Sequence, residues 1–317
     1  MKKKLFLLAG LSAAAAHVAA SKGVEAGFEK YFRADPDLDE MDINDVLTTE
    51  ELRNLYFAEV DKHVDWFRSV KTENQTITSF DGLKLDAVLI RENEGHRYIL
   101  MAHGYRTDRY LLLKQAYEMS KRGYNILLID QRGYGHSEGE YTTFGLKESL
   151  DVAQWINHLV KLDPEAEIGL YGVSMGAASV LMALGMTLPE NVRFAVSDSA
   201  FTNLYDETGF LYGKQAPTGY PVYAFYMNRI LKDKLGFKME DVDCLRAVSR
   251  NKIPVLFIHS NTDKTIPYQM GIDLFNANAG YKKFYPLKNC EHVFGCYQDP
   301  HYFDNIEQFI KGIEEQQ

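Results

Sequence analysis

Short apolar runs alternate with amphipathic stretches over most of this 317-residue chain, and this alternation is the strongest constraint on its fold. Buried strands are typically short apolar runs, whereas helices place apolar residues three or four positions apart. The strands are expected at residues 98–102, 125–129, 168–171, 194–196, 254–259 and 283–287. The helices are expected at 111–121, 147–161, 177–186, 268–277 and 302–314. The pattern predicts an α/β fold, a mostly parallel central sheet flanked by helices, with any ligand beyond the carboxyl ends of the strands.

Two further elements are expected before this alternation. Residues 76–80 and 83–90 flank Asp81-Gly82, a signal for a two-residue hairpin turn, so an antiparallel pair opens the main domain. Upstream, the run from Thr48 to Glu51 offers a capping box, and apolar residues then recur at helical spacing. A helix is therefore predicted over about 49–68.

The first residues have the order of a secretory signal. Three lysines at positions 2–4 precede an apolar stretch at 5–16, and small residues follow at 18–20. We interpret residues 1–22 as a signal peptide or membrane anchor outside the fold, which favours a secreted or membrane-associated protein. The alternative is a cytoplasmic protein with an ordinary N-terminal helix. Residues 23–75 are then an acidic connector and a helix, since eight acidic residues and no basic one lie between Asp35 and Glu51.

Composition excludes several classes of protein. With 44 acidic against 35 basic residues and a net charge of -9, the chain lacks the clustered Lys and Arg that nucleic acid requires. Three cysteines cannot form a disulfide framework. The glycines at 133, 135 and 139 miss the dinucleotide spacing by one residue, and zinc-binding spacings are absent from the sequence, so neither cofactor nor metal is predicted.

The motif that carries chemistry is Gly172-Val173-Ser174-Met175-Gly176, between an expected strand and an expected helix. This strand-turn-helix context is that of a nucleophile elbow, in which a strained turn exposes the serine hydroxyl. Side chains at 172 and 176 would collide with neighbouring backbone, which explains glycine at both positions. Ser174 is therefore the predicted nucleophile.

A serine nucleophile needs a base, and the base needs an orienting carboxylate. Asp263 and His292 each follow a later strand, so both belong at the same sheet edge as Ser174. We expect His292 to be the base and Asp263 the acid. Asp198, at the end of the strand before, is the alternative acid, although it also suits a structural acceptor.

Hydrolysis also needs donors aimed at the developing oxyanion. The expected donors are the backbone amides of Met175, directly after the nucleophile, and Tyr105, on the loop after the strand 98–102. Gly104 is expected to permit close approach of the backbone. His103, on the same loop, is a candidate pocket residue, although bracing of the loop explains it better.

About fifty residues separate the strand at 194–196 from the next, too many for a simple loop. This insertion, at about 201–250, holds nine aromatic residues between Phe201 and Phe237. We interpret it as a lid or pocket wall; the alternative is that the rings only pack the insertion onto the sheet. The candidate pocket residues are Phe201, Tyr205, Tyr220 and Tyr223.

From about residue 76 to its end, the chain resembles a serine hydrolase of the α/β-hydrolase superfamily. His103-Gly104-Tyr105 resembles the oxyanion loop of that family, residues 130–137 its loop after the next strand, and residues 172–176 its elbow. Residues 257–267 are similar to its acid loop, and Glu291-His292 to its histidine turn. The likeness extends to uncharacterised bacterial members with a short N-terminal hydrophobic segment, related to acyl esterases and to prolyl-peptidase-like catalytic domains. The propeller of those peptidases is not found in this sequence, which favours esters over oligopeptides.

The predicted function is hydrolysis of small, neutral or apolar carboxylic esters through an acyl-enzyme. An amidase or peptidase of small substrates is the second hypothesis, and a non-catalytic binding protein with the same fold is the third. The expected partners are a small-molecule ester and, through residues 1–22, a membrane. Cys290 and Cys296 bracket His292, and a disulfide between them is a further hypothesis.

Overall fold

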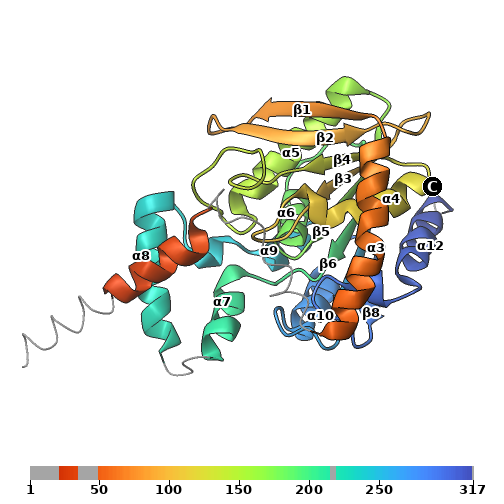
Figure 1. The fold of residues 1–317 in the computed structure, drawn as a ribbon. Coiled ribbons are helices and arrows are strands. Elements are labelled where there is room, and N and C mark those ends of the chain that lie inside the picture. The colour runs from red at the N-terminus through yellow and green to blue at the C-terminus, as the bar shows by residue number, and fades with distance from the viewer. Residues whose placement is uncertain (1–20, 35–48, 215–218, 316–317) are drawn as a thin grey trace, which may run out of the picture.

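The computed structural model describes residues 21–34, 49–214 and 219–315 (Figure 1). An eight-stranded sheet forms the centre, in the order β1-β2-β4-β3-β5-β6-β7-β8. The strands are β1 (Thr72–Thr78), β2 (Lys84–Ile90), β3 (Arg97–Ala102), β4 (Asn125–Ile129), β5 (Glu167–Val173), β6 (Val192–Asp198), β7 (Val255–Ser260) and β8 (Lys282–Leu287). Strands β3 to β8 pair in parallel, and β2 is antiparallel to both β1 and β4. The predicted fold class and the six predicted parallel strands are confirmed.

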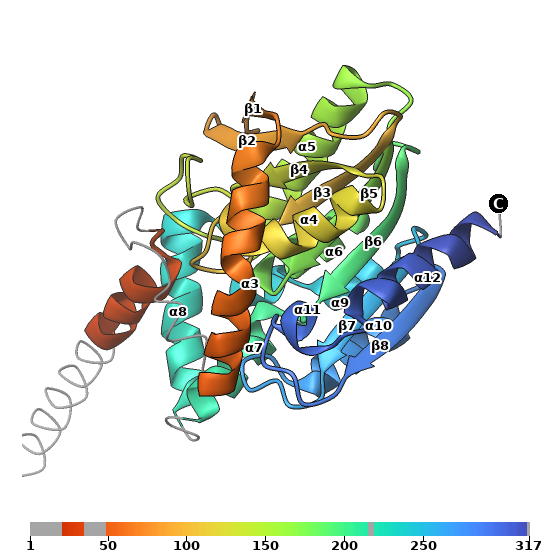
Figure 2. The ribbon, with the colours of Figure 1, turned by 45° about the vertical axis from the view of Figure 1, so that its right-hand side comes forward.

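Helices cover both faces of the sheet (Figure 2). One face carries α5 (Leu146–Leu162), α6 (Met175–Leu184), α9 (Cys244–Val248) and α10 (Tyr268–Ala277). The other carries α3 (Glu50–Ser69), η1 (Arg109–Leu112), α4 (Leu113–Lys121), α11 (Gly295–Gln298) and α12 (Tyr302–Glu314). The central strands are apolar throughout because each is covered on both faces.

The two elements predicted ahead of the sheet are present, with one correction. Helix α3 begins after Thr49, whose hydroxyl accepts the amide of Leu52 at 3.1 Å. The hairpin turn is longer than the predicted two residues, since it takes up residues 79–83. Ser79 and Leu83 close this longer turn: the Ser79 hydroxyl accepts the Leu83 amide, and the Ser79 amide donates to the Leu83 carbonyl, both at 2.8 Å.

The N-terminal region departs from the expectation. Residues 1–20 and 35–48, which hold most of the predicted leader and acidic connector, lie outside the described residues. Residues 21–32, however, form a helix that packs on the core through Val24, Phe28 and Phe32. The packed residues all follow residue 22, so the first part of the segment expected to be a connector is a helix docked on the core. None of the helices in the described part of the chain has the length and apolar character needed to cross a membrane.

The insertion after β6 is helical. It contains α7 (Leu204–Gly213), α8 (Tyr220–Leu235) and η2 (Met239–Asp241), and it returns through α9. In Figure 1, α7 and α8 extend from the sheet on the side where the helix of residues 21–32 also lies. Several predicted pocket tyrosines belong to the contact between α7 and α8, where the rings of Tyr205 and Tyr220 lie 5.1 Å apart and those of Tyr212 and Tyr223 4.7 Å apart.

Candidate active site

The turn between β5 and α6 holds Ser174 in an unusual backbone conformation. Its φ is 53°, in the left-handed region that few non-glycine residues adopt. A Cβ at Gly172 would lie 2.4 Å from the Gly176 carbonyl oxygen, and one at Gly176 would lie 2.1 Å from that of Ala102. Both glycines are required, as predicted. At Gly104 a Cβ would meet the Ser174 Cβ at 3.6 Å, an ordinary contact, so backbone approach does not require that glycine.

Ser174, His292 and Asp263 form one chain of hydrogen bonds. The Ser174 Oγ lies 2.9 Å from the His292 Nε2, and the His292 Nδ1 lies 2.7 Å from the Asp263 Oδ2. This arrangement lets the imidazole accept the serine proton while the carboxylate fixes its orientation. The structure brings all three predicted residues together from loops at the carboxyl ends of β5, β7 and β8.

Asp263 is held as a carboxylate although its side chain is fully buried. Its Oδ1 accepts the amides of Thr265 and Ile266 at 2.8 and 2.9 Å. Burial raises the pKa of Asp263, but hydrogen bonds and charge from His259 and His292 outweigh burial and hold the pKa below its ordinary range. A permanent negative charge beside the His292 Nδ1 stabilises the imidazolium that forms when serine gives up its proton.

Asp198, the alternative acid, serves a different purpose. Its carboxylate accepts the Tyr302 hydroxyl at 2.6 Å and the Ser199 hydroxyl at 2.8 Å. Burial raises the pKa of Asp198, partly offset by these hydrogen bonds. The carboxylate is thus tied to α12 and acts as a structural acceptor.

The predicted oxyanion donors come from two segments that touch. Met175 opens α6, where the first amides have no partner within the helix. The loop carrying Tyr105 follows β3, and the carbonyls of Ala102 and His103 pack against Gly176 of the elbow. The Tyr105 side chain turns away from the elbow, stacks on Phe144 at 5.0 Å and donates its hydroxyl to the Tyr31 carbonyl at 2.8 Å.

His103 braces this loop from behind and does not line a pocket. It is fully buried, its Nδ1 lies 2.8 Å from the Gly104 carbonyl oxygen, and its Nε2 accepts the Gln131 amide at 2.9 Å. Burial lowers the pKa of His103, which keeps the ring neutral. The Gln131 side chain completes the brace, since it bonds the His103 carbonyl at 2.5 Å and accepts the Ser179 hydroxyl at 2.7 Å.

The other predicted pocket residues have packing partners. Phe201 is buried in the core, and Tyr220 donates its hydroxyl to the Tyr205 carbonyl. The Tyr223 ring approaches the helix of residues 21–32 at Gly27. These contacts favour the packing interpretation for the rings.

The sequence interpretation missed Glu207, on the first turn of α7. It is 6% exposed, and its Oε2 has no hydrogen-bond partner among the described residues. Burial and then the negative charge of Asp263 raise its pKa to about 8. Its helix also reaches the acid loop directly, through a hydrogen bond from the Lys214 ammonium to the Lys264 carbonyl. Apart from the place of Glu207 in the insertion, nothing in the sequence indicates a buried carboxyl beside the triad.

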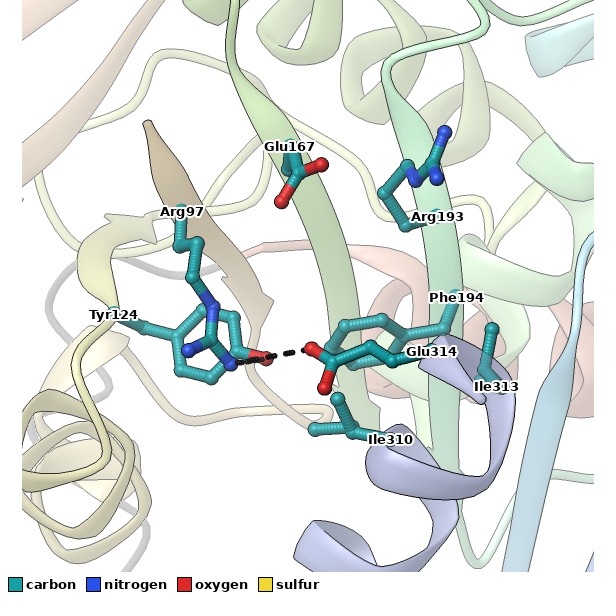
Figure 3. A pocket seen from close by; sticks show the side chains of 8 residues that line it. All are labelled: Arg97, Tyr124, Glu167, Arg193, Phe194, Ile310, Ile313 and Glu314. Atoms are coloured by element: carbon teal, nitrogen blue, oxygen red, sulfur yellow. Dashed lines mark hydrogen bonds and ion pairs between the residues drawn. The ribbon is translucent and has the colours of Figure 1, made fainter. Parts of the chain in front are cut away.

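Two other features of the described residues do not suit a functional site. A cavity of about 50 Å³ lies between Arg97, Tyr124 and Glu314, where Arg97 and Glu314 form an ion pair at 3.8 Å (Figure 3). The cavity lies at the amino ends of the strands. Its volume is far below that of a typical ligand pocket, which is roughly 300–1,000 Å³.

The second feature is a cluster of Asp86, Asp130 and His136, whose ligand atoms lie within 4.8 Å of one another. Arg109 bonds both carboxylates, so we assign the cluster a structural role.

All three cysteines are free and buried, so the hypothesis of a bridge between Cys290 and Cys296 is not supported.

Comparisons with known proteins bear on the family and the fold. The family model of X-Pro dipeptidyl-peptidase (S15 family) matches residues 81–234, a segment that includes Ser174 but ends before Asp263 and His292. The uncharacterised protein YqkD of Bacillus subtilis is 26% identical over 263 residues, covering 81% of this chain and 86% of its own.

Solved structures match over a similar share of the chain. The Pyrococcus furiosus esterase Pf2001 superposes with a TM-score of 0.62 at 24% identity, covering 77% of this chain and 93% of its own. Pyrococcus horikoshii acylaminoacyl peptidase superposes with a TM-score of 0.56 at 19% identity. The match covers 78% of this chain but 43% of the peptidase. The sheet order, the elbow and these likenesses lead to one conclusion: the chain has the α/β-hydrolase fold.

Proposed function

We propose that the protein is a serine hydrolase that cleaves carboxylic esters through an acyl-enzyme. The observation that carries the proposal is the continuous chain from Ser174 Oγ through His292 to the buried Asp263 carboxylate. Ser174 attacks the acyl carbonyl, His292 takes its proton and passes it to the departing alcohol, and a water activated by His292 releases the acid. The amides of Met175 and Tyr105 stabilise the oxyanion.

The substrate class follows from the surroundings of the triad. The insertion, which reaches the acid loop through the hydrogen bond from Lys214 to Lys264, is rich in tyrosine and phenylalanine, and the chain carries a net charge of -9. The negative charge disfavours polyanions, and the aromatic composition of the insertion supports neutral or apolar acyl groups. We also infer export or membrane attachment through residues 1–22, on the sequence pattern alone.

Cleavage of small peptides or amides is the second candidate. It is supported by the S15 family match and by the likeness to an acylaminoacyl peptidase. The chain covers less than half of that peptidase, whereas it covers nearly the whole of the matched esterase. Esters are therefore the first choice.

The test is covalent labelling with a fluorophosphonate, followed by a substrate panel. Wild type should label and Ser174→Ala should not, with Ser199→Ala as the matched control because Ser199 is also a serine with positive φ near the site. Aryl esters should be hydrolysed faster than aminoacyl anilides. Absence of wild-type labelling, or labelling that persists in Ser174→Ala, rules out the assigned nucleophile; faster anilide cleavage selects the second candidate.

A further inference from the structure

The helix of residues 21–32 is anchored to the hydrolase by an apolar face. Val24, Phe28 and Phe32, spaced four residues apart, are 8%, 0% and 3% exposed. The Phe28 ring lies 5.3 Å from that of Tyr141, and the Phe32 ring 5.1 Å from that of Phe144. This burial of two phenylalanines makes the segment part of the folded core.

The same helix contacts the insertion. The Lys234 ammonium of α8 pairs with Glu29 at 2.5 Å and lies 4.8 Å from the Phe28 ring centre. The chain after the helix continues this docking, because the Ala34 amide donates to the Glu140 carbonyl and the Thr142 amide to the Phe32 carbonyl, both at 2.8 Å. The helix thus bridges α8 and the loop that precedes α5.

The last turn of this helix is bonded by the oxyanion loop. The Tyr105 hydroxyl donates to the Tyr31 carbonyl at 2.8 Å, and the Arg106 guanidinium donates to the Lys30 carbonyl. Carbonyls in a last turn have no partner within the helix and carry partial negative charge, which suits a cationic donor. Two consecutive loop residues therefore have their side chains fixed by one helix end.

The loop needs such support. Arg106 has a φ of 54°, a conformation that costs a non-glycine residue about 1 kcal/mol or more and persists only where surrounding contacts impose it. The assigned oxyanion donor, the Tyr105 N–H, lies in the peptide between Gly104 and Tyr105, one peptide before the φ bond of Arg106. We expect a change of backbone conformation at Arg106 to reach that amide through the Tyr105 backbone.

We propose that the helix of residues 21–32 is a positioning element of the active site, which holds the oxyanion loop in its working conformation through Tyr105 and Arg106. The inference rests on the proposed hydrolase function and lies outside the matched family segment, which begins at residue 81. It also makes the N-terminal segment necessary for catalysis, because this segment holds the loop that carries the oxyanion donor.

The test removes the tethers and leaves the loop backbone in place. Tyr105→Phe deletes one hydroxyl, Arg106→Met deletes the guanidinium, and the double variant deletes both. The matched control is Tyr98→Phe, which deletes a hydroxyl bonded to Asp163 at the amino end of the same strand, β3. The measurements are kcat and KM on a short-chain aryl ester, together with Tm.

We expect the double variant to lose about 10- to 100-fold in kcat, approaching the loss of one oxyanion donor, with KM within about threefold. Arg106→Lys should recover part of the loss, and Tyr98→Phe should keep wild-type kcat. A double variant with wild-type kcat, or one in which only Tm falls, overturns the inference. An inactive wild type refutes the proposed function instead, so the two failures are distinct.

A second measurement tests whether the helix affects kcat through the oxyanion loop. Phe28→Ala removes the central anchor of the helix and should lower kcat by a similar factor, with faster proteolysis within residues 21–34. Combined with the tether variants, it should add little further loss, because both changes release the same loop. Multiplicative losses would show independent effects and overturn the proposed route.

Discussion

The backbone amide of Ser174 donates to the carbonyl oxygen of Asp198 at 2.8 Å, so the nucleophile and the alternative acid are joined through the main chain. The Asp198 side chain points elsewhere, to Tyr302 of α12. Asp198 therefore supports the elbow through its backbone, while Asp263 alone of the two carboxylates bonds the His292 imidazole.

Because the two carboxylates have different roles, the same substitution should affect them differently. Asp263→Asn should lower kcat by about 10⁴-fold, because the imidazole loses the charge that orients and stabilises it. Asp198→Asn should keep kcat within about tenfold and lower Tm, since one of its two buried acceptor contacts is lost. Steady-state kinetics and thermal melts on both variants check this. The assignment is reversed if Asp198→Asn is the more damaging to kcat.

Two glycines next to the nucleophile should respond differently to alanine. Gly176→Ala places a Cβ 2.1 Å from the Ala102 carbonyl oxygen and should destabilise the fold by at least about 3 kcal/mol. Gly104→Ala meets only an ordinary 3.6 Å contact and should fold normally. Urea unfolding measures both. Equal stability of the two variants would contradict the tight packing of the elbow.

Glu207 gives stability a pH dependence with a definite sign. Its ordinary pKa of 4.5 applies to the unfolded chain, and burial raises the folded value to about 8, so the folded state retains a proton that the unfolded state releases. Stability should fall as pH rises from about 4.5 to about 8. Glu207→Gln should be more stable than wild type by about 1–3 kcal/mol at pH 8.5, with the difference shrinking towards pH 5.

The control for this titration is Glu94→Gln, which removes the same charge from an exposed loop. Urea unfolding at pH 5, 7 and 8.5 gives the free energies of unfolding. A difference between Glu207→Gln and wild type that does not change with pH would mean that Glu207 is ionised in the folded protein.

We expect substitution of Gln131 to lower both stability and kcat, although Gln131 is not a member of the triad. Gln131→Met keeps the side-chain volume but leaves the His103 carbonyl without the Gln131 donor and the Ser179 hydroxyl without the Gln131 acceptor. We expect a loss of about 1–3 kcal/mol in stability and a lower kcat through a looser oxyanion loop. The control is Gln154→Met, at a half-buried glutamine of α5 whose side-chain amide donates to the Thr78 carbonyl at 3.4 Å. Unchanged kcat and stability in Gln131→Met would refute the bracing role.

Much of the fold could be predicted because its signals are local. Apolar runs located β3 to β8, and the glycine spacing around Ser174 located the elbow, since only glycine fits at 172 and 176. The order Ser174, Asp263, His292 sufficed for the triad because parallel strands bring their carboxyl ends to one edge.

The remaining features depend on tertiary contacts that the sequence does not encode locally. The face formed by Val24, Phe28 and Phe32 is visible as a four-residue spacing, but its position directly after an apolar leader made it read as connector. For the tyrosines of the insertion, composition supports both a pocket wall and internal packing, because it cannot distinguish a ring that faces a ligand from one that faces another helix. Glu207 and Gln131 have roles that only their neighbours define.

The loops after β7 and β8 are joined by hydrogen bonds besides the one between His292 and Asp263: the Asn289 amide donates to the Asn261 Oδ1 at 2.9 Å, and the Ser260 and Thr262 hydroxyls donate to the Cys290 carbonyl at 2.5 and 3.1 Å. Asp263 and His292 are therefore tied to each other at several points, whereas Ser174 belongs to the elbow between β5 and α6. We therefore expect the distance between the Ser174 hydroxyl and the His292 imidazole to be the more adjustable of the two triad contacts when an acyl group is bound to Ser174.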